Sequence, residues 1–217
     1  MNGPENEMKI MDDSKWVSYT RQASAHQFCG PAQKIVELVA SLPEFPDMKK
    51  MLDLGGGAGF YTMLIVSAHE NMKGVVFDLP QVTSVTREFI QEYSVRDRVS
   101  TMTGDYVKDS LGNSYDLIFA GGTLNFAKKH VDTIFNKIYT ALNPGGIFIS
   151  QHGSVSHERT QPGYQVLDFL FDELSGMDFI FPKGMIAEAM HQCGFKSVQS
   201  IVQKSEFGDI DIDIAKK

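Results

Sequence analysis

Regularly spaced glycines form the part of the sequence best suited to chemistry. Gly55, Gly57 and Gly59 stand at alternate positions after the apolar run of residues 51–54, a run typical of a buried parallel strand. Residues 60–66 continue as an apolar helix. Because glycine has no Cβ, its backbone can turn sharply and approach a ligand closely, and the following helix begins with unpaired N–H groups. This strand, turn and helix predict a nucleotide-type site at the carboxyl edge of a sheet.

The residues around these glycines narrow the class of site. The dinucleotide fingerprint G-x-G-x-x-G would place a third glycine where the chain has Phe60, and no Lys-Ser or Lys-Thr pair follows to make a P-loop. The sequence also lacks the Tyr-x-x-x-Lys proton relay of many oxidoreductases. An NTPase is therefore disfavoured as the function, and an NAD-dependent oxidoreductase is a less favoured alternative. A glycine turn alone also fits a plain strand-to-helix connection.

An acid that ends a predicted strand strengthens the case for a ligand. Asp78 ends the predicted strand of residues 74–78, where a carboxylate can accept hydrogen bonds from ribose hydroxyls. The alternative is a cap for the helix that begins at Pro80. Asp53 lies inside an apolar strand, where an unpaired charge is costly, so we expect it to accept N–H bonds from the glycine turn.

A second acid follows the third predicted strand. Asp105 comes directly after Gly104 and can face an adenine amino group, with Tyr106 packing on the ring. An ordinary turn aspartate is the alternative at this position. Taken together, the spacing of these acids is more specific than any one of them.

Strands alternate with helices along most of the chain, which predicts a parallel sheet covered on both faces. Near the start, Gly30 and Pro31 separate two expected helices within residues 16–42. Residues 151–182 interrupt the alternation, although residues 164–174 fit a helix. The expected strands are residues 50–54, 74–78, 99–103, 115–120 and 147–150, followed by a closing hairpin of 196–203 and 208–214; the expected helices are residues 80–93, 130–142 and 183–193. The prediction is an α/β, Rossmann-like fold with seven mostly parallel strands and a C-terminal antiparallel hairpin.

Composition limits the possible partners. The chain has 217 residues, 42% of them hydrophobic, and a formal charge of −7 from 27 acids and 20 bases. This balance suits one globular domain and disfavours non-specific nucleic-acid binding. Its two cysteines, Cys29 and Cys193, make neither a disulfide framework nor a zinc site, and no metal is expected. Residues 1–14 are polar and acidic, unlike a signal peptide, and no run is long enough to span a membrane, so we expect a cytoplasmic protein.

Four motifs together resemble a known family. They are residues 51–59 (MLDLGGGAG), 76–82 (VFDLPQV), 104–106 (GDY) and 142–146 (LNPGG). They are similar to the catalytic domain of S-adenosylmethionine (SAM)-dependent O-methyltransferases of class I, in particular the caffeate and hydroxyneurosporene type. The resemblance covers roughly residues 16–195.

The resemblance implies a cofactor and a set of residues that bind it. By analogy the cofactor is SAM, Asp78 binds its ribose, and Asp105 with Tyr106 frames its adenine. The remaining members of the implied set are Asp53, Gly55, Gly57, Leu79, Gly104 and Gly121.

Family members usually carry a dimerisation domain before the catalytic domain. Only about 50 residues precede the first predicted strand here, so we expect the chain to be either a fragment or a shortened form without that domain, and the oligomeric state cannot be carried over. We expect residues 1–48 to form a helical cap, residues 49–217 to form the SAM-binding domain, and residues 151–182 to form an insertion within it that covers the substrate.

The general base is the second departure from the family. In the family, the general base is a histidine soon after the fourth strand. Alignment from Asp116 places Asn125 at that position in this chain. An amide can orient a substrate but cannot take its proton near neutral pH. Histidine titrates near neutrality, so His152, at the end of the fifth strand, is the preferred replacement, followed by His157 and His26. A surface or core-edge role is the alternative for each.

The acceptor is expected to be a small aromatic or apolar molecule. Aromatic and aliphatic side chains of residues 164–181, with Trp16, Tyr19 and Phe28, can line an apolar pocket or simply pack the covering helices together. The resemblance implies O-methylation. C- or N-methylation, or SAM binding without catalysis, remains the alternative because the expected base is missing.

Overall fold

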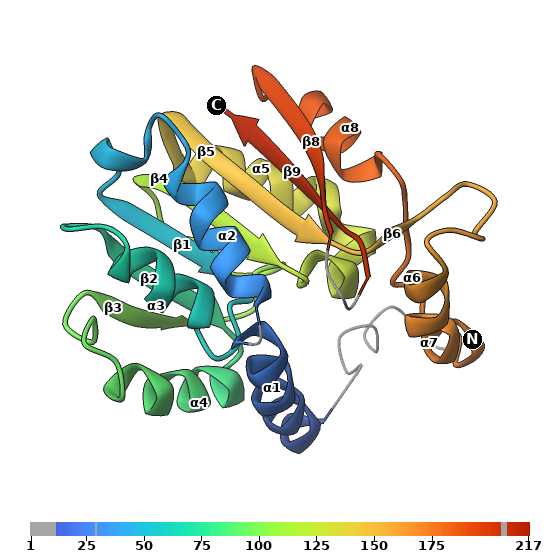
Figure 1. Ribbon diagram of the computed structural model, residues 1–217, viewed down its shortest axis with the longest axis horizontal. Helices are drawn as coiled ribbons and strands as arrows, with labels where there is room; N and C mark the ends of the chain where they lie inside the picture. The colour runs from blue at the N-terminus through green and yellow to red at the C-terminus, as the bar shows by residue number, and fades with distance from the viewer. Residues whose placement is uncertain (1–11, 29, 205–207) are drawn as a thin grey trace.

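The computed structural model describes residues 12–28, 30–204 and 208–217. Their seven-stranded sheet has the order β3-β2-β1-β4-β5-β9-β8, as Figure 1 shows. The first five strands run parallel, β9 runs antiparallel to β5, and β8 runs antiparallel to β9. The strands are β1 (Lys50–Leu54), β2 (Lys73–Asp78), β3 (Val99–Thr103), β4 (Tyr115–Gly121), β5 (Leu142–His152), β8 (Ser197–Gln203) and β9 (Ile210–Lys216). The predicted fold class and its closing hairpin are confirmed.

The central strand β1 marks the point where the strand order reverses. The chain moves from β1 outward through β2 to β3, and then returns to place β4 on the other side of β1. In open α/β sheets, ligands bind beside the carboxyl ends of strands at such a reversal. The glycine turn that follows β1 therefore lies where a ligand site is expected.

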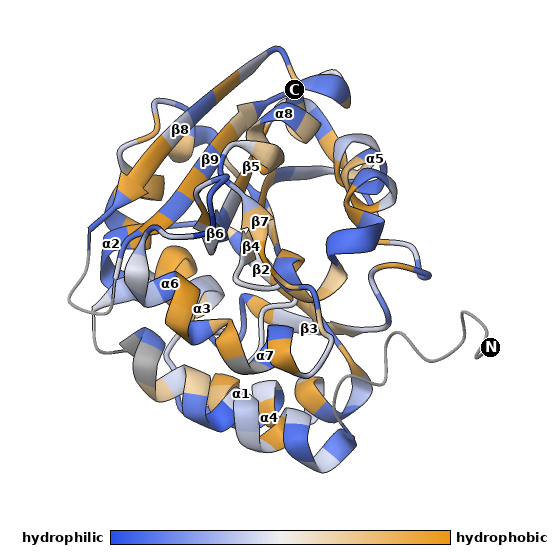
Figure 2. Ribbon diagram, turned by 90° about the vertical axis from the view of Figure 1, so that its right-hand side faces the viewer, coloured by the Kyte–Doolittle hydropathy of each residue, from blue (hydrophilic) through white to orange (hydrophobic). Residues whose placement is uncertain are grey.

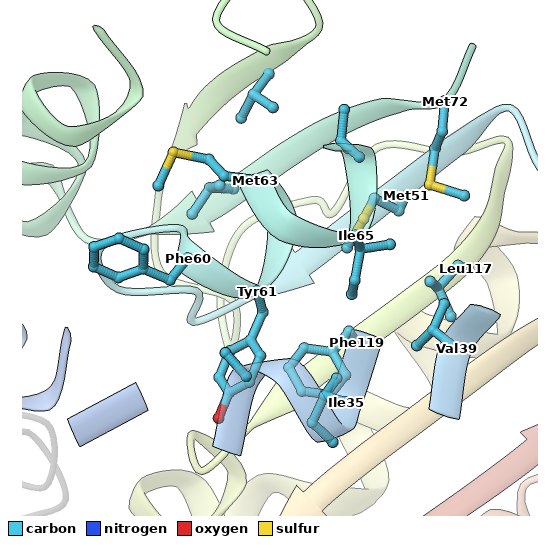
Figure 3. Packing of buried hydrophobic residues seen from close by; sticks show 14 of the residues in the cluster. Ile35, Val39, Met51, Phe60, Tyr61, Met63, Ile65, Met72, Leu117 and Phe119 are labelled. Carbon is cyan, nitrogen blue, oxygen red and sulfur yellow. The ribbon is translucent and has the colours of Figure 1, made fainter. Parts of the chain in front are cut away.

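Helices cover both faces of the sheet. On one face, α2 (Pro31–Ala40), α3 (Phe60–Ser67) and α4 (Pro80–Gln91) bury a core that includes Ile35, Met51, Met63 and Phe119, which Figure 3 shows packed together. On the other face, α5 (Val131–Ala141) and α8 (Met185–Gln192) bury residues that include Leu52, Phe135, Phe148 and Met190. Alternate residues of the central strands enter opposite cores, which is why these strands are mostly apolar.

The helix α1 (Asp13–Phe28) lies beside α4, as Figure 1 shows. Arg21 joins the two helices, because its guanidinium lies 2.5 Å from the Glu88 carboxylate and 5.9 Å from the centroid of the Phe89 ring. The predicted break at Gly30 and Pro31 separates α1 from α2. The short helix η2 (Phe45–Asp47) precedes β1.

The segment between β5 and α8 departs from the prediction in one respect. The expected single helix of residues 164–174 is two short helices, α6 (Gly163–Asp168) and α7 (Leu170–Leu174), with Phe169 in a bend between them. The strands β6 (Ser154–Val155) and β7 (Phe181–Pro182) pair in parallel at the base of this segment. Because the pairing closes a loop, α6 and α7 extend to one side of the sheet, as Figure 1 shows.

The second difference concerns the start of β5. Residues 143–146, which lie between the expected helix of residues 130–142 and the expected strand of residues 147–150, fall within the bounds of β5, with a register irregularity between Tyr115 and Leu117 of β4. Asn143 explains the attachment of this stretch to β4, because its side-chain amide donates to the Asp116 carboxylate at 2.7 Å. Within the described residues, no helix combines the length and the apolar character needed to cross a membrane.

Candidate active site

The glycine turn after β1 is shaped by three residues with positive φ. Gly55, Gly57 and Gly59 have φ values of +63°, +57° and +81°, a region that side chains with a Cβ rarely adopt. The Gly55 N–H donates to the Phe77 carbonyl of β2 at 2.8 Å, and the Gly59 N–H donates to the Gly56 carbonyl at 2.9 Å. The turn is thus held to β2 at one end and begins α3 at the other.

Asp78 grips the turn from the end of β2. One carboxylate oxygen accepts the Gly57 N–H at 2.9 Å, and the other accepts the Leu79 N–H at 2.7 Å. Burial raises the pKa of Asp78 to about 6, against the effect of these two N–H bonds. An ionised carboxylate has about four acceptor positions, so two remain for further donors.

Asp53 lies beneath the same turn but bonds elsewhere. Its side chain is fully buried, and one oxygen accepts the Thr62 hydroxyl of α3 at 2.8 Å. The sequence led us to expect bonds from the glycine turn instead. The second oxygen has no hydrogen-bond partner among the described residues, and burial, the largest cause, raises the pKa of Asp53 to about 7. A Cβ on Gly56 would lie 2.6 Å from the Asp53 carboxyl carbon, so the turn closes directly over this acid.

The loop after β3 brings its predicted residues to the same edge. The Gly104 N–H donates to the Asp78 carbonyl at 3.0 Å. Asp105 accepts the Val107 N–H at 2.9 Å and lies 3.2 Å from the Lys108 ammonium. These contacts are those of a turn aspartate, and they use part of the acceptor capacity of its carboxylate.

Thr123 is a site residue that the sequence analysis missed. Its hydroxyl donates to the Tyr106 hydroxyl at 3.0 Å, and Tyr106 lies 3.2 Å from the Thr123 carbonyl. A Cβ on Gly55 would lie 2.1 Å from the Thr123 hydroxyl oxygen, so only glycine leaves room for it. The glycine turn, the β3 loop and the end of β4 are therefore joined around Thr123. Its position directly after Gly121 and Gly122, at the end of a predicted strand, was the available signal.

Two further predicted glycines are required by packing alone. A Cβ on Gly121 would lie 2.7 Å from the Phe119 ring, and a Cβ on Gly104 would lie 2.8 Å from the Phe77 ring. Both would be too close for any real Cβ contact. Their glycine identity therefore follows from the protein's own packing, whatever ligand the edge of the sheet binds.

Asn125, at the position of the expected base, holds residues 153–180 in place. We call these residues the covering segment. It is buried in η3 (Leu124–His130), and its amide nitrogen donates to the Gly153 carbonyl at 3.0 Å and the Phe179 carbonyl at 2.7 Å. Lys128 of the same helix lies 2.7 Å from the Asp178 carboxylate and 2.5 Å from the Ile180 carbonyl. Together, Asn125 and Lys128 tie both ends of residues 153–180 to the end of β4.

His152 is enclosed by protein. Its side chain is 2% exposed, its Nδ1 lies 3.1 Å from the Ser150 hydroxyl, and its Nε2 lies 3.7 Å from the Asp213 carboxylate. Burial lowers the pKa of His152, while the nearby Asp213 and Asp211 oppose that effect. In this arrangement, both ring nitrogens face protein groups rather than a substrate. His157 is exposed, and the side chain of His26 lies outside the described part of the chain.

Aromatic side chains from three elements meet above this edge. The Phe126 ring of η3 lies 5.4 Å from Trp16 and 5.9 Å from Tyr19 of α1, and 5.2 Å from Phe179 of the covering segment, all between ring centroids. We call Trp16, Tyr19, Phe126 and Phe179 the aromatic cluster. Phe126, which the sequence analysis did not single out, therefore joins the predicted Trp16 and Tyr19 of α1 to the predicted Phe179.

Other predicted apolar residues of the covering segment do not join this cluster. Leu167, Leu170 and Leu174 are 66%, 41% and 76% exposed, and Figure 2 shows hydrophobic residues on the outer turns of α6 and α7. The side chains of Phe28 and Phe171 lie outside the described part of the chain. Within the described ranges, no group of three or more His, Cys, Asp or Glu side chains is arranged to hold a metal.

Comparison with known proteins decides the family. Residues 12–171 match the model of the O-methyltransferase domain. The chain belongs to this family. This O-methyltransferase domain is 42% identical over 123 residues to an uncharacterized protein of Methanocaldococcus jannaschii, covering 57% of this chain and 32% of that protein.

Solved structures share its fold. A putative O-methyltransferase from Nostoc punctiforme matches with a TM-score of 0.80 and 22% identity, covering 93% of this chain and 60% of that one. The structure of PigF with S-adenosylhomocysteine (SAH) matches with a TM-score of 0.77 and 20% identity, covering 95% of this chain and 60% of that one. PigF of Serratia is also among the curated relatives, as a SAM-dependent methyl transferase. The chain spans a third to a half of the length of the curated relatives it matches.

Proposed function

We propose that this O-methyltransferase domain binds SAM at the carboxyl edge of β1, β2 and β4 and transfers its methyl group to a small aromatic or apolar acceptor. The observation that carries the proposal is the Asp78 carboxylate, which holds the Gly57 N–H at 2.9 Å and retains acceptor positions for a ribose. The relative PigF, whose name states SAM-dependent methyl transfer, supports the choice of cofactor.

The residues at the turn fit this cofactor. A Cβ on Gly57 would meet no atom nearer than the Thr20 methyl group of α1, at 3.9 Å. The Gly57 backbone is therefore accessible to a ligand on this side. In the proposal, Gly55 and Gly57 approach the amino-acid end of the cofactor, Asp78 and Leu79 hold its ribose, and Asp105 with Tyr106 flanks its adenine. Asp53, Gly104 and Gly121 support these contacts from below. SAM supplies a methyl group already activated on a sulfonium.

The acceptor is proposed from the aromatic cluster. Trp16, Phe126 and Phe179 come from α1, η3 and the covering segment, and they lie beyond the strand ends where a flat apolar molecule would meet the cofactor. In the proposal, residues 12–48 and 151–182 cover the cleft and exclude water. Orientation of the acceptor is the main task, because methyl transfer needs the nucleophile, the methyl carbon and the sulfur in line.

The proton of the acceptor is not assigned to a side chain. The Asn125 amide bonds two carbonyls, and both ring nitrogens of His152 face Ser150 and Asp213. We therefore propose that the domain acts on an acceptor that is ionised near neutral pH, such as an acidic phenol, and that His152 positions β5 against β9. Oxygen is the proposed acceptor atom by family membership. Transfer to carbon or nitrogen is the alternative that the same site permits.

A SAM-binding protein without transfer is the second candidate, favoured by Asn125 at the position of the base. Incubation with methyl-labelled SAM and a panel of phenols, quinones, thiols and amines, read by mass spectrometry, separates the two candidates. A labelled phenol is the expected product. Binding of SAH without transfer to any acceptor would favour the second candidate. Thermal shift with SAH but not NAD is expected in both cases. We also propose a cytoplasmic location, which cell fractionation tests.

A further inference from the structure

A groove lies at the amino edge of the sheet, opposite the candidate active site. Its volume is about 640 Å³, and residues that open β1, β2 and β3 line it. They include Lys49, Lys50, Lys73, Val75, Arg98 and Ser100. The glycine turn, Asp78 and Asn125 are all at the other ends of these strands or beyond them, so the groove is separate from that site.

The connection from β3 to β4 explains why this part of the sheet is open. Residues 104–114, all of which the structure describes, contain no helix. A parallel sheet normally buries both faces beneath its crossover helices. Here Val75 and Met102 pack only partly against the core beneath α5 and α8, and Ser100 is exposed. β2 and β3 therefore form the floor of the groove, with the partly buried Val75 as its apolar side chain and Ser100 beside it.

Three cations stand side by side above this floor. Lys50 pairs with Lys73 in the register of β1 and β2, and the pairing of Gly74 with Val99 places Lys73 beside Arg98. Adjacent strands are about 4.8 Å apart, and like charges opposite each other destabilise a sheet. In a protein with a formal charge of −7, three neighbouring cations at one edge form a local site for an anion.

Two of these three cations, Lys50 and Arg98, already bond to the protein, whereas Lys73 and the adjacent Lys49 remain available. The Lys50 ammonium donates to the Asn113 carbonyl at 3.0 Å and lies 4.3 Å from the centroid of the Tyr115 ring. The Arg98 guanidinium donates through Nη1 alone, to the His69 carbonyl at 2.7 Å and the Met72 carbonyl at 3.3 Å, so its position is fixed while its other N–H groups can face a ligand. The ammonium groups of Lys49 and Lys73 have no hydrogen-bond or ion-pair partner among the described residues. The exposed Asp97 is the acid that also lines the groove.

We propose that this groove binds a small anionic molecule with an apolar body, held by Lys49, Lys73 and Arg98 over Val75. Its volume lies within the range of about 300–1,000 Å³ that is usual for small-molecule sites. In the proposal, the apolar part lies over Val75, and the anionic group faces Lys49, Lys73 and Arg98. The site is independent of methyl transfer, and it remains if the domain proves to bind no SAM.

The test uses anilinonaphthalene sulfonate, a fluorescent probe with an aromatic body and one anionic group, in the presence of saturating SAH. We expect saturable fluorescence and amide NMR shifts at Lys50, Gly74 and Ser100. Lys73→Glu should weaken binding by about tenfold or more, because it replaces a charge-assisted contact by repulsion. Affinity should also fall as the salt concentration rises.

Two further variants make the result specific. Ser100→Trp fills the groove from an exposed position and should abolish binding, whereas Lys196→Glu reverses an exposed charge beside β8 and should leave it unchanged. Equal affinity for the wild type and Lys73→Glu would overturn the proposal. So would NMR shifts confined to the glycine turn and residues 121–125, or the absence of saturable binding. Circular dichroism of each variant confirms that the comparison is made between folded proteins.

Discussion

Replacing Asn125 by alanine tests the attachment of the covering segment. The substitution removes two N–H bonds to the Gly153 and Phe179 carbonyls, at 3.0 and 2.7 Å. Each bond contributes about 1 kcal/mol net, and a buried carbonyl left without a donor costs about 1–3 kcal/mol. The closed position of the segment should therefore lose about 2–4 kcal/mol. This corresponds to roughly 30-fold to several hundred-fold more frequent opening.

Amide hydrogen exchange measures this opening directly. The Lys183 N–H donates to the Val155 carbonyl at 2.9 Å, and the Ser156 N–H donates to the Gln161 carbonyl at 2.7 Å. Both amides should exchange faster in Asn125→Ala by the factor above. The amides of β1 should keep their rates, because they open only when the whole sheet unfolds.

Two variants sharpen the result. Asn125→Asp keeps the size of the side chain but turns a carboxylate toward two carbonyl oxygens, so it should open the segment at least as much as alanine does. Asn136→Ala removes an exposed amide that donates to the Asp132 carbonyl and accepts from the Cys193 thiol at 3.7 Å, both outside residues 153–180, so it should change nothing at Lys183. Unchanged exchange at Lys183 and Ser156 in Asn125→Ala would refute the attachment, as would a uniform increase over the whole sheet.

Three further changes have defined outcomes. Burial raises the pKa of Asp53 from 3.8 to about 7, so the folded protein holds a proton that the unfolded chain has lost between these pH values, and the wild type loses stability as pH rises. Asp53→Asn should therefore gain stability relative to the wild type between pH 4 and 8, by at most about 4 kcal/mol, in urea unfolding. A difference in unfolding free energy that stays constant over this pH range would contradict the prediction. His152→Gln should keep the midpoint of the pH–rate profile and the SAH affinity; loss of a titrating limb would instead identify His152 as the base. Gly55→Ala should lower thermal stability clearly more than Gly145→Ala. Both glycines have positive φ, but only at Gly55 would a Cβ lie 2.1 Å from the Thr123 hydroxyl oxygen. Equal losses of stability in the two variants would show that the structure relaxes to remove the clash.

The sequence predicted the fold because its local signals agree with one another. Short runs rich in apolar residues alternate with helices of amphipathic spacing, and glycine or proline separates many of them. The bend at Phe169 was not predicted, because the apolar spacing of residues 164–174 continues across it. The pairing of β6 with β7 was also missed, since a two-residue strand carries no periodic pattern and depends on a partner 27 residues away.

The site was predicted in part. The residues of the glycine turn and Asp78 meet as expected because they end neighbouring parallel strands, and that arrangement follows from the strand order. Contacts between side chains did not follow from spacing. Asp53 bonds Thr62 rather than the turn, and Thr123 fills the space left by Gly55, because both outcomes depend on packing between elements that the sequence does not place.

The role of His152 shows the same limit. The end of the fifth strand does lie at the expected edge of the sheet, but β9 pairs beside β5 and brings Asp213 to 3.7 Å from its ring. A position along a strand therefore indicates which edge a residue occupies. It does not indicate whether the neighbouring strand encloses the side chain.

Calorimetric titration with SAH tests the central claim, that the glycine turn and Asp78 hold the cofactor. We expect the wild-type protein to bind SAH and not NAD, and Asp78→Ala to bind SAH at least about tenfold more weakly, since a charged acceptor contributes about 1.5–3 kcal/mol to each hydrogen bond. Asp47→Ala, which removes an exposed acid at the opposite edge, should bind like the wild type. Folded wild-type protein that gives no heat with SAH, or Asp78→Ala with unchanged affinity, would contradict the account.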